Sequence, residues 1–272
     1  MSQQKSSSPR RLSVQHFARS KQEGNKIVVL TAYDALFARL EDQAGVDAIL
    51  VGDSAGMVVA GHETTLPVTM EQMLYHAACV TRGVKRAFVI VDMPFLSVQI
   101  SREQALTNCG RMLAETGVQA VKIEGGGAIA STIASIVDAG IPVMGHLGLI
   151  PQSIHSLGSY RTRGTETSEA ETLRHDALAL QDAGCFSLVL EKVEPGLARE
   201  ISASLRIPTI GIGSGVDCDG QVLVNVDMLG LFEEFKPRFV RQFAHLAEDV
   251  RRAVGDYATA VRSGEFPGKD EV

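Results

Sequence analysis

Short apolar runs recur along the chain, and segments with helical spacing lie between them. These runs predict strands at 26–30, 48–52, 87–91, 120–124, 142–146, 187–191, 208–212 and 221–224. Near-continuous apolar runs of this length are typical of strands buried on both faces, as in parallel sheets. The pattern therefore indicates repeated strand–helix units.

The segments between the runs carry a helical period. The first example is the series Met70, Met73, Leu74, Ala77 and Val80. The second is the series Phe239, Phe243, Leu246, Val250 and Val254, in a helical stretch expected from Pro237 onward. Apolar residues three and four positions apart share one face of a helix. Glycines 45, 140 and 184 are predicted to end helices, since glycine readily adopts the left-handed conformation found there.

Eight strands alternating with helices in a chain of 272 residues match an α/β fold of the (β/α)8 TIM-barrel type. A doubly wound open sheet is the competing architecture, but its usual G-x-G-x-x-G turn does not follow the first strand. We predict a single barrel domain over residues 13–268 with a C-terminal helical extension. Residues 1–12, which include a Ser/Gln-rich stretch, are predicted to be a disordered tail.

Composition narrows the possible partners. Hydrophobic residues make up 45% and charged residues 21%, as in ordinary soluble proteins. A net charge of -6 without a long basic run argues against nucleic acid, and no apolar run is long enough for a membrane span. The four cysteines form no C-x-x-C pair, so we expect reduced thiols and a cytoplasmic protein.

Ionisable residues end several of the predicted strands. They are Asp53, Asp92, Glu124, His146 and Glu191. Since the carboxyl ends of barrel strands meet at one mouth, we expect these side chains to converge. For each residue alone, a strand-end cap or salt bridge is the simpler interpretation, and a single histidine could be hydrogen-bonded in the core. The shared placement favours a functional site.

Several carboxylates in one place repel one another unless cations are shared among them. Lys122 supplies one positive charge, which is too little for four carboxylates. Oxygen ligands suit Mg²⁺, bound by one or two carboxylates with water and substrate completing its shell. Asp53 and Asp92 are the expected ligand pair, with Glu124 as a direct or water-mediated ligand. Lys122 and His146 would offset part of the negative charge and help to bind an anionic substrate.

A long connection, residues 147–167, follows the fifth strand. It contains Gln152, Ser153, Tyr160 and Arg161. Connections of this length in compact domains are often lids or binding loops, so we expect this one to close over a substrate.

The ordered set of motifs resembles the ketopantoate hydroxymethyltransferase family over about residues 13–268. The motifs are Gly52-Asp53-Ser54, residues 61–69, Asp92-Met93-Pro94-Phe95, residues 121–126, residues 145–153 and Leu190-Glu191. The resemblance implies a TIM barrel of the phosphoenolpyruvate/pyruvate-like type. It also implies transfer of a one-carbon unit from 5,10-methylenetetrahydrofolate to 3-methyl-2-oxobutanoate, giving 2-dehydropantoate in pantothenate biosynthesis.

The resemblance further implies which residues act. Mg²⁺ would be bound at Asp53, Asp92 and Glu124, the keto acid would contact Asp53, Ser54, Asp92 and Lys122, and Glu191 would be the proton acceptor. The family is cytoplasmic and commonly forms homodecamers.

Two other functions compete with this one. Lyases of the isocitrate lyase or phosphoenolpyruvate mutase type also use Mg²⁺ and 2-oxo acids, but they carry a Lys-Cys-Gly-His loop. Here the corresponding segment is Gly145-His146-Leu147-Gly148, without a cysteine. A non-catalytic binding or assembly protein would be indicated by loss of ionisable strand ends, and all of them are present.

Overall fold

A computed structural model describes residues 11–234 and 237–272. It divides into two compact units, Met1–Leu223 and Val224–Val272, which are described one at a time. Positions 1–10 of the predicted tail lie outside the described residues.

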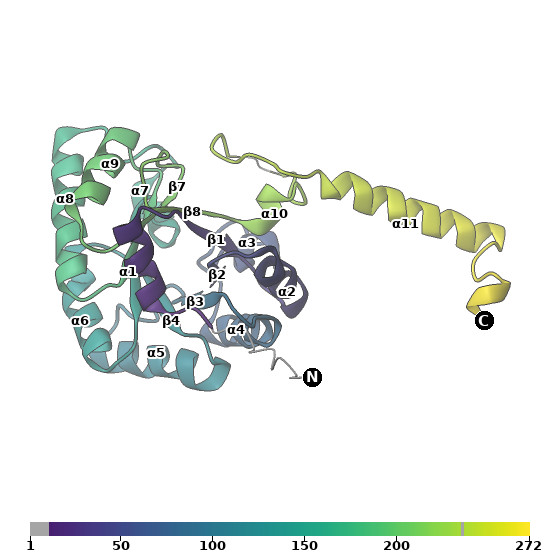
Figure 1. Cartoon of the computed structure of the whole chain (residues 1–272), viewed down its shortest axis with the longest axis horizontal. Coiled ribbons are helices and arrows are strands. Elements are labelled where there is room, and N and C mark those ends of the chain that lie inside the picture. Colours follow the sequence, from purple (N-terminus) through teal and green to yellow (C-terminus); the bar gives the residue numbers. More distant parts are fainter. Residues whose placement is uncertain (1–10, 235–236) are drawn as a thin grey trace, which may run out of the picture. The chain divides into compact units, whose positions relative to one another are not determined.

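The first unit is built on a closed barrel of eight parallel strands (Figure 1). The strands are β1 (Ile27–Thr31), β2 (Ala48–Val51), β3 (Phe88–Asp92), β4 (Ala120–Glu124), β5 (Val143–Gly148), β6 (Ser187–Glu191), β7 (Thr209–Ile212) and β8 (Gly220–Leu223). Each strand pairs with the next along the chain, and β8 pairs with β1. The ring confirms the predicted TIM-barrel fold and excludes the open sheet.

Helices connect most of the strands. They are α1 (Val14–Glu23), α2 (Ala35–Ala44), α3 (Ala55–Val58), α4 (Met70–Gly83), α5 (Arg102–Thr116), α6 (Ala130–Asp138), α7 (Ile154–Leu157), α8 (Thr167–Asp182) and α9 (Pro195–Ser204), with short 3-10 turns at Gly127–Ile129 and Pro151–Ser153. The helix predicted around Met70 is confirmed as α4. It begins at a capping box in which the Thr69 hydroxyl accepts from the Gln72 backbone and the Gln72 side chain accepts from Thr69 N.

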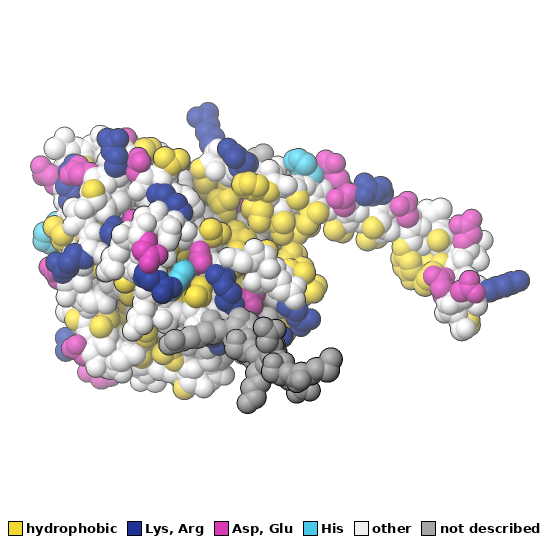
Figure 2. Space-filling view, viewed as in Figure 1, with side chains coloured by type: hydrophobic (Ala, Val, Ile, Leu, Met, Phe, Trp, Pro, Cys, Tyr) yellow, Lys and Arg dark blue, Asp and Glu magenta, His cyan; other side chains and the backbone are white. Residues whose placement is uncertain are grey.

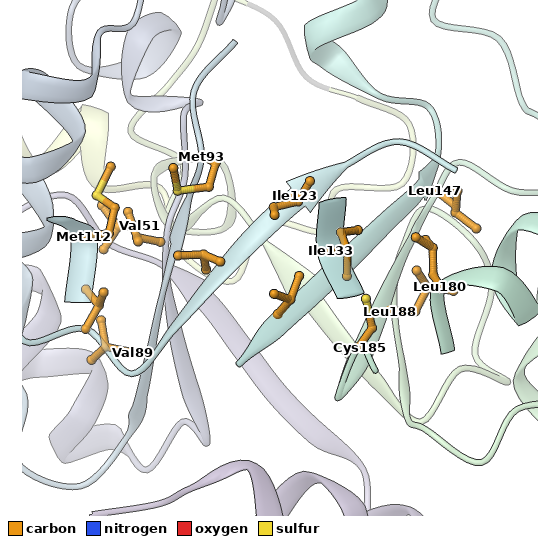
Figure 3. Packing of buried hydrophobic residues seen from close by; sticks show 14 of the residues in the cluster. Val51, Val89, Met93, Met112, Ile123, Ile133, Leu147, Leu180, Cys185 and Leu188 are labelled. Atoms are coloured by element: carbon orange, nitrogen blue, oxygen red, sulfur yellow. The ribbon is translucent and has the colours of Figure 1, made fainter. Parts of the chain in front are cut away.

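Alternation along the strands creates two hydrophobic layers. Side chains such as Phe88 and Ile90 belong to a cluster inside the barrel. The intervening residues, such as Val89, belong to a larger cluster with helical residues such as Met112 and Ile133 (Figure 3). Successive strand residues point to opposite faces, so burial on both faces accounts for the nearly continuous apolar runs.

The amino-terminal end of the barrel is closed by α1, a helix that the sequence analysis did not predict. Its Phe17 is fully buried and makes edge-to-face contacts with Phe88 and Phe186, with ring centroids 5.6 and 5.2 Å apart. Phe88 begins β3 and Phe186 precedes β6, so this aromatic cluster lies at the end of the barrel opposite the strand-end carboxylates.

One sector of the outer helical layer is incomplete in the first unit. Within the described residues, no helix lies between β7 and β8. Val28 lies between Ile27 and Val29 of β1, which face the barrel interior, so its side chain points outward, and it is 50% exposed. Leu36 and Leu40 on α2 are also exposed. A barrel strand normally buries its outward side chains under helices, so this sector lacks a cover.

The second unit contains α10 (Asn225–Met228), α11 (Leu246–Ser263) and a 3-10 turn at Lys269–Glu271. The helix expected from Pro237 is wrong for residues 237–245. There the backbone N–H of Phe243 bonds to Met228 O, and that of Leu246 bonds to Leu229 O. Because these N–H groups bond to carbonyls outside the segment, they do not form helical hydrogen bonds within it, and α11 begins only at Leu246.

Helix α11 presents an exposed apolar stripe (Figure 2). The stripe consists of Val250, Val254, Tyr257 and Val261, which are 45 to 61% exposed. Their spacing by three and four places them on one face. Among the described residues, no helix has the length and apolar character required to cross a membrane.

The buried aromatic cluster generates a stability prediction. Replacing Phe17 with alanine should lower the free energy of unfolding by about 3 to 5 kcal/mol, because it leaves a cavity under Phe88 and Phe186. Urea denaturation at fixed protein concentration measures the loss. Tyr75→Ala, at a position 68% exposed, is the control. A loss no larger than that of the control would contradict a sealing role for α1.

Candidate active site

The ionisable strand ends continue the rows of residues that line the barrel interior. Asp92 lies two positions after the interior residue Ile90, and His146 lies two after Met144. Lys122 and Glu124 follow Ala120 at the same spacing. Residues two apart on a strand share a face, so these polar side chains lie above the apolar plug at the carboxyl end. The predicted convergence is therefore confirmed for these residues.

Asp53 and Asp92 form a buried carboxylate pair. The backbone N–H of Asp53 donates to Asp92 Oδ2 at 3.1 Å, and both residues are 4% exposed. Burial raises the pKa of both side chains, and the neighbouring charges of Asp92 and Glu124 raise that of Asp53 further. Lys122 acts to lower the pKa of both aspartates, but burial outweighs it.

Lys122 supplies the central positive charge. Its Nζ lies 3.1 Å from Asp92 Oδ1, 3.7 Å from Glu124 Oε1 and 2.9 Å from His146 Nδ1. Burial acts to lower the pKa of Lys122, but the surrounding carboxylates outweigh it and the net shift is upward. The ammonium group therefore stays charged and ties β3, β4 and β5 together.

His146 lies between Lys122 and Glu191. Its Nδ1 lies 2.9 Å from Lys122 Nζ and 3.3 Å from Glu124 Oε1, and its other ring nitrogen, Nε2, faces β6. That nitrogen lies 3.4 Å from Glu191 Oε2. The histidine thus connects the lysine–carboxylate cluster to the carboxylate of β6, which lies across the ring from β2.

Glu124 is held by three groups. Its Oε1 contacts Lys122 and, at 3.3 Å, His146 Nδ1, while its Oε2 accepts from the backbone N–H of Gln152 at 3.0 Å. Burial acts to raise the pKa of Glu124, but these polar contacts lower it overall. Its oxygens are therefore more fully engaged than those of Asp53.

Gln152 is a buried member of this site that the sequence analysis assigned only to a loop. Its Nε2 donates to Asp53 Oδ2 and to Met93 O, each at 2.8 Å. The first half of the 147–167 connection thus lies against the site, whereas Tyr160 and Arg161 farther along are exposed. Length alone could flag the connection, but only the fold shows which residue turns inward.

Ser54 lies beside Asp53 and hydrogen bonds to Tyr33, with 2.9 Å between Ser54 Oγ and the phenol oxygen. Tyr33 follows β1 and was also not identified from the sequence. A Cβ at Gly52 would lie 2.6 Å from Ser54 Oγ, so a larger residue there would displace this hydroxyl. The polar side chains thus extend from β1 round to β6.

The described carboxylates do not form a complete metal cage by themselves. No group of three or more His, Cys, Asp or Glu side chains among the described residues is arranged to hold a metal ion. The Asp53–Asp92 pair can contribute oxygen ligands, with other ligands needed from outside the chain.

The segment that crosses the mouth depends on Gly148. Its φ is +96°, and a Cβ there would lie 2.2 Å from the carbonyl oxygen of Glu191. The next residue, Leu149, donates its N–H to that same oxygen at 2.8 Å. Close approach of the two backbones therefore fixes the path from β5 to Gln152 and anchors β6 beside it.

Comparison with known proteins places these features in context. A family model described as ketopantoate hydroxymethyltransferase matches residues 11–269. A 3-methyl-2-oxobutanoate hydroxymethyltransferase from Prosthecochloris aestuarii is 58% identical over 255 residues, covering 92% of each chain. One from Syntrophotalea carbinolica is 52% identical and covers 96% of this chain and 98% of the relative.

Solved structures with low sequence identity share the fold. A phosphonopyruvate hydrolase in complex with oxalate and Mg²⁺ aligns with a TM-score of 0.63 at 12% identity, covering 96% of this chain and 93% of that one. A 2,3-dimethylmalate lyase, of the phosphoenolpyruvate mutase/isocitrate lyase superfamily, gives 0.60 at 18% identity, covering 97% and 89%. These likenesses confirm the predicted (β/α)8 barrel fold and carry no further functional argument.

The close contact at Gly148 generates a prediction. Gly148→Ala should destabilise the protein and displace Glu191, because the added Cβ meets backbone rather than a flexible side chain. Gly158→Ala is a matched control: φ is +66° there, and nothing lies within 4 Å of the added Cβ. The control isolates the cost of a left-handed residue, about 1 to 2 kcal/mol. Thermal unfolding measures the stability that each of the two variants loses. An equal loss in both would show that the contact at Gly148 is unimportant.

Proposed function

The chain belongs to the ketopantoate hydroxymethyltransferase family, and from this we propose that it transfers a hydroxymethyl unit from 5,10-methylenetetrahydrofolate to 3-methyl-2-oxobutanoate, giving 2-dehydropantoate in pantothenate biosynthesis. The observation that carries the proposal is the arrangement of Asp53, Asp92 and Lys122 on one side of the mouth and Glu191 on the other. Such a site can hold an anionic 2-oxo acid between a positive centre and a base.

Mg²⁺ fits the donor set. Asp53 and Asp92 are buried carboxylates side by side, and among the described residues the one cation in contact with the pair is Lys122, 3.1 Å from Asp92 Oδ1. We assign these two residues as direct ligands and Glu124, whose oxygens are engaged elsewhere, as a water-mediated one. When bound, the ion would polarise the 2-oxo group and stabilise negative charge on its oxygen.

The chain's own residues account for substrate binding. Lys122 faces the carboxylate pair and offers a charge for the substrate's carboxylate or for the developing oxyanion. His146 directs its Nε2 towards Glu191 and adds a polar contact at the mouth. The Ser54 hydroxyl, oriented by Tyr33, supplies a further hydrogen bond beside Asp53.

Glu191 is the proposed base. It takes the proton from C3 of the keto acid, and the electron pair left behind is delocalised onto the 2-oxo group. Water replaces both folate nitrogens on the methylene carbon, so that tetrahydrofolate leaves and the carbon carries the water oxygen as formaldehyde. C3 then forms a bond to this carbon while its C=O double bond becomes a C–O single bond, and the resulting alkoxide takes up a proton to give the hydroxymethyl group. Glu191 lies on β6, four places from β2 in a ring of eight, so a base there would face a substrate bound at Asp53 from the opposite side.

Isotope exchange tests this assignment. Glu191→Gln should slow Mg²⁺-dependent exchange of the C3 proton of 3-methyl-2-oxobutanoate in D₂O by roughly a hundredfold to ten-thousandfold, the usual contribution of a general base. Proton NMR follows the exchange without folate. Asp53→Asn should instead weaken Mg²⁺ binding. If the unsubstituted protein showed no exchange, the transferase proposal would be wrong; if both variants kept full activity, the residue assignment would be wrong.

We also propose that the protein is a homo-oligomer, a decamer as the family resemblance implies, in which α11 of one copy packs on another barrel. Support comes from two apolar surfaces. The α11 stripe, Val250, Val254, Tyr257 and Val261, is exposed, and so is the barrel sector at Val28. A second copy could cover both. We place the enzyme in the cytoplasm, consistent with its four free cysteines.

Val254→Asp tests the oligomer. A charge in the middle of the α11 stripe should reduce the mass measured by sedimentation velocity, because the interface would have to bury it. Thr259→Asp introduces the same charge on the opposite side of the helix and should leave the mass unchanged. If the unsubstituted protein were monomeric, the oligomer proposal would be wrong, because no second copy would then cover the α11 stripe.

A further inference from the structure

Gln152 links the ends of three barrel strands. Its side-chain Nε2 donates to Asp53 Oδ2 after β2 and to Met93 O after β3, and its backbone N–H donates to Glu124 Oε2 on β4. The residue is 6% exposed, so these bonds are shielded from water. No other residue of the 147–167 connection has a side-chain hydrogen bond of this kind to the carboxylates among the described contacts.

The partners of Gln152 determine the orientation of its amide. Asp53 Oδ2 and Met93 O are both acceptors, so the NH₂ group must face them and Oε1 must face the other way. This Oε1 is buried and has no hydrogen-bond donor in the described part of the chain. A buried amide oxygen is costly to leave unpaired, so the working site should provide a donor from outside the protein.

The same bonds leave a consistent set of oxygens on the two aspartates. Asp53 Oδ2 accepts from Gln152, and Asp92 Oδ2 accepts from Asp53 N. In each carboxylate one oxygen is therefore engaged in positioning the group. The second oxygen of each is the one left for a cation, and at Asp92 Oδ1 the cation would share that oxygen with Lys122 Nζ, which lies 3.1 Å away.

We propose that Gln152 is a positioning residue for the divalent cation: it orients the Asp53 carboxylate and offers its buried Oε1 to a water molecule that the cation retains. This inference deepens the proposed function, on which its Mg²⁺ requirement rests. Mg²⁺ keeps several waters when bound by one or two carboxylates, and such waters are strong donors. Partners that orient ligands in this way commonly change metal affinity by 10- to 100-fold.

The test uses Gln152→Met, which keeps the side-chain length and the backbone N–H to Glu124 but removes both amide functions. Calorimetric titration of the full-length protein with MgCl₂ should give a dissociation constant roughly 10- to 100-fold higher than that of the unsubstituted chain. The Mg²⁺ concentration for half-maximal C3 exchange should rise in parallel. The exchange rate at saturating Mg²⁺ should change much less, a split that a general loss of structure would not produce.

Gln43→Met is the control, because Gln43 is exposed on α2 and should leave Mg²⁺ binding unchanged. Gln152→Ala provides a second variant that also keeps the backbone bond. Mg²⁺ affinity within twofold of the unsubstituted protein in either folded variant would overturn the proposal, as would failure of both to fold, which would make Gln152 a structural tether. If the unsubstituted chain bound Mg²⁺ but did not exchange C3, the proposed function would fail, while the titration would still decide the role of Gln152.

Discussion

The site depends on one buried ammonium group placed among carboxylates. Lys122 lies within 3.1 Å of Asp92 and 3.7 Å of Glu124, and it also holds His146. Its charge balances part of a cluster that burial would otherwise drive towards protonation. One lysine cannot balance all of these groups: burial, together with the charges of Asp92 and Glu124, raises the pKa of Asp53. The same imbalance makes the site suitable for a divalent cation and an anionic substrate.

The barrel makes this arrangement possible because it separates the two ends of each strand. Apolar side chains such as Phe88 and Ile90 fill the lower interior, and Phe17 on α1 seals it. The upper positions of the same rows are then free to carry polar groups without disturbing the packed layers. The packed core and the ionisable site thus lie at different heights along the same strands, as is general for this fold.

The segment that leaves β5 connects the two sides of the mouth. Gly148 allows the backbone to pass close to Glu191, and Leu149 bonds to the Glu191 carbonyl. A few residues later, Gln152 bonds to Asp53 and to Glu124. The proposed base and the carboxylate pair are therefore tied to one short stretch of chain, so a change in that stretch is transmitted to both.

The sequence by itself determined the eight strands, α4 and the residues that end the strands, because strand burial and helical period depend on local patterns. It did not reveal α1, since Phe17 is buried only by partners distant in sequence. It placed the final helix too early, because residues 243 and 246 bond to residues 228 and 229 instead. Only the tertiary structure decided that Gln152 joins Asp53, since that contact links positions 99 residues apart. The periodicity of the sequence predicts which face of a helix or strand a residue occupies, whereas the tertiary structure determines which residues pack against that face.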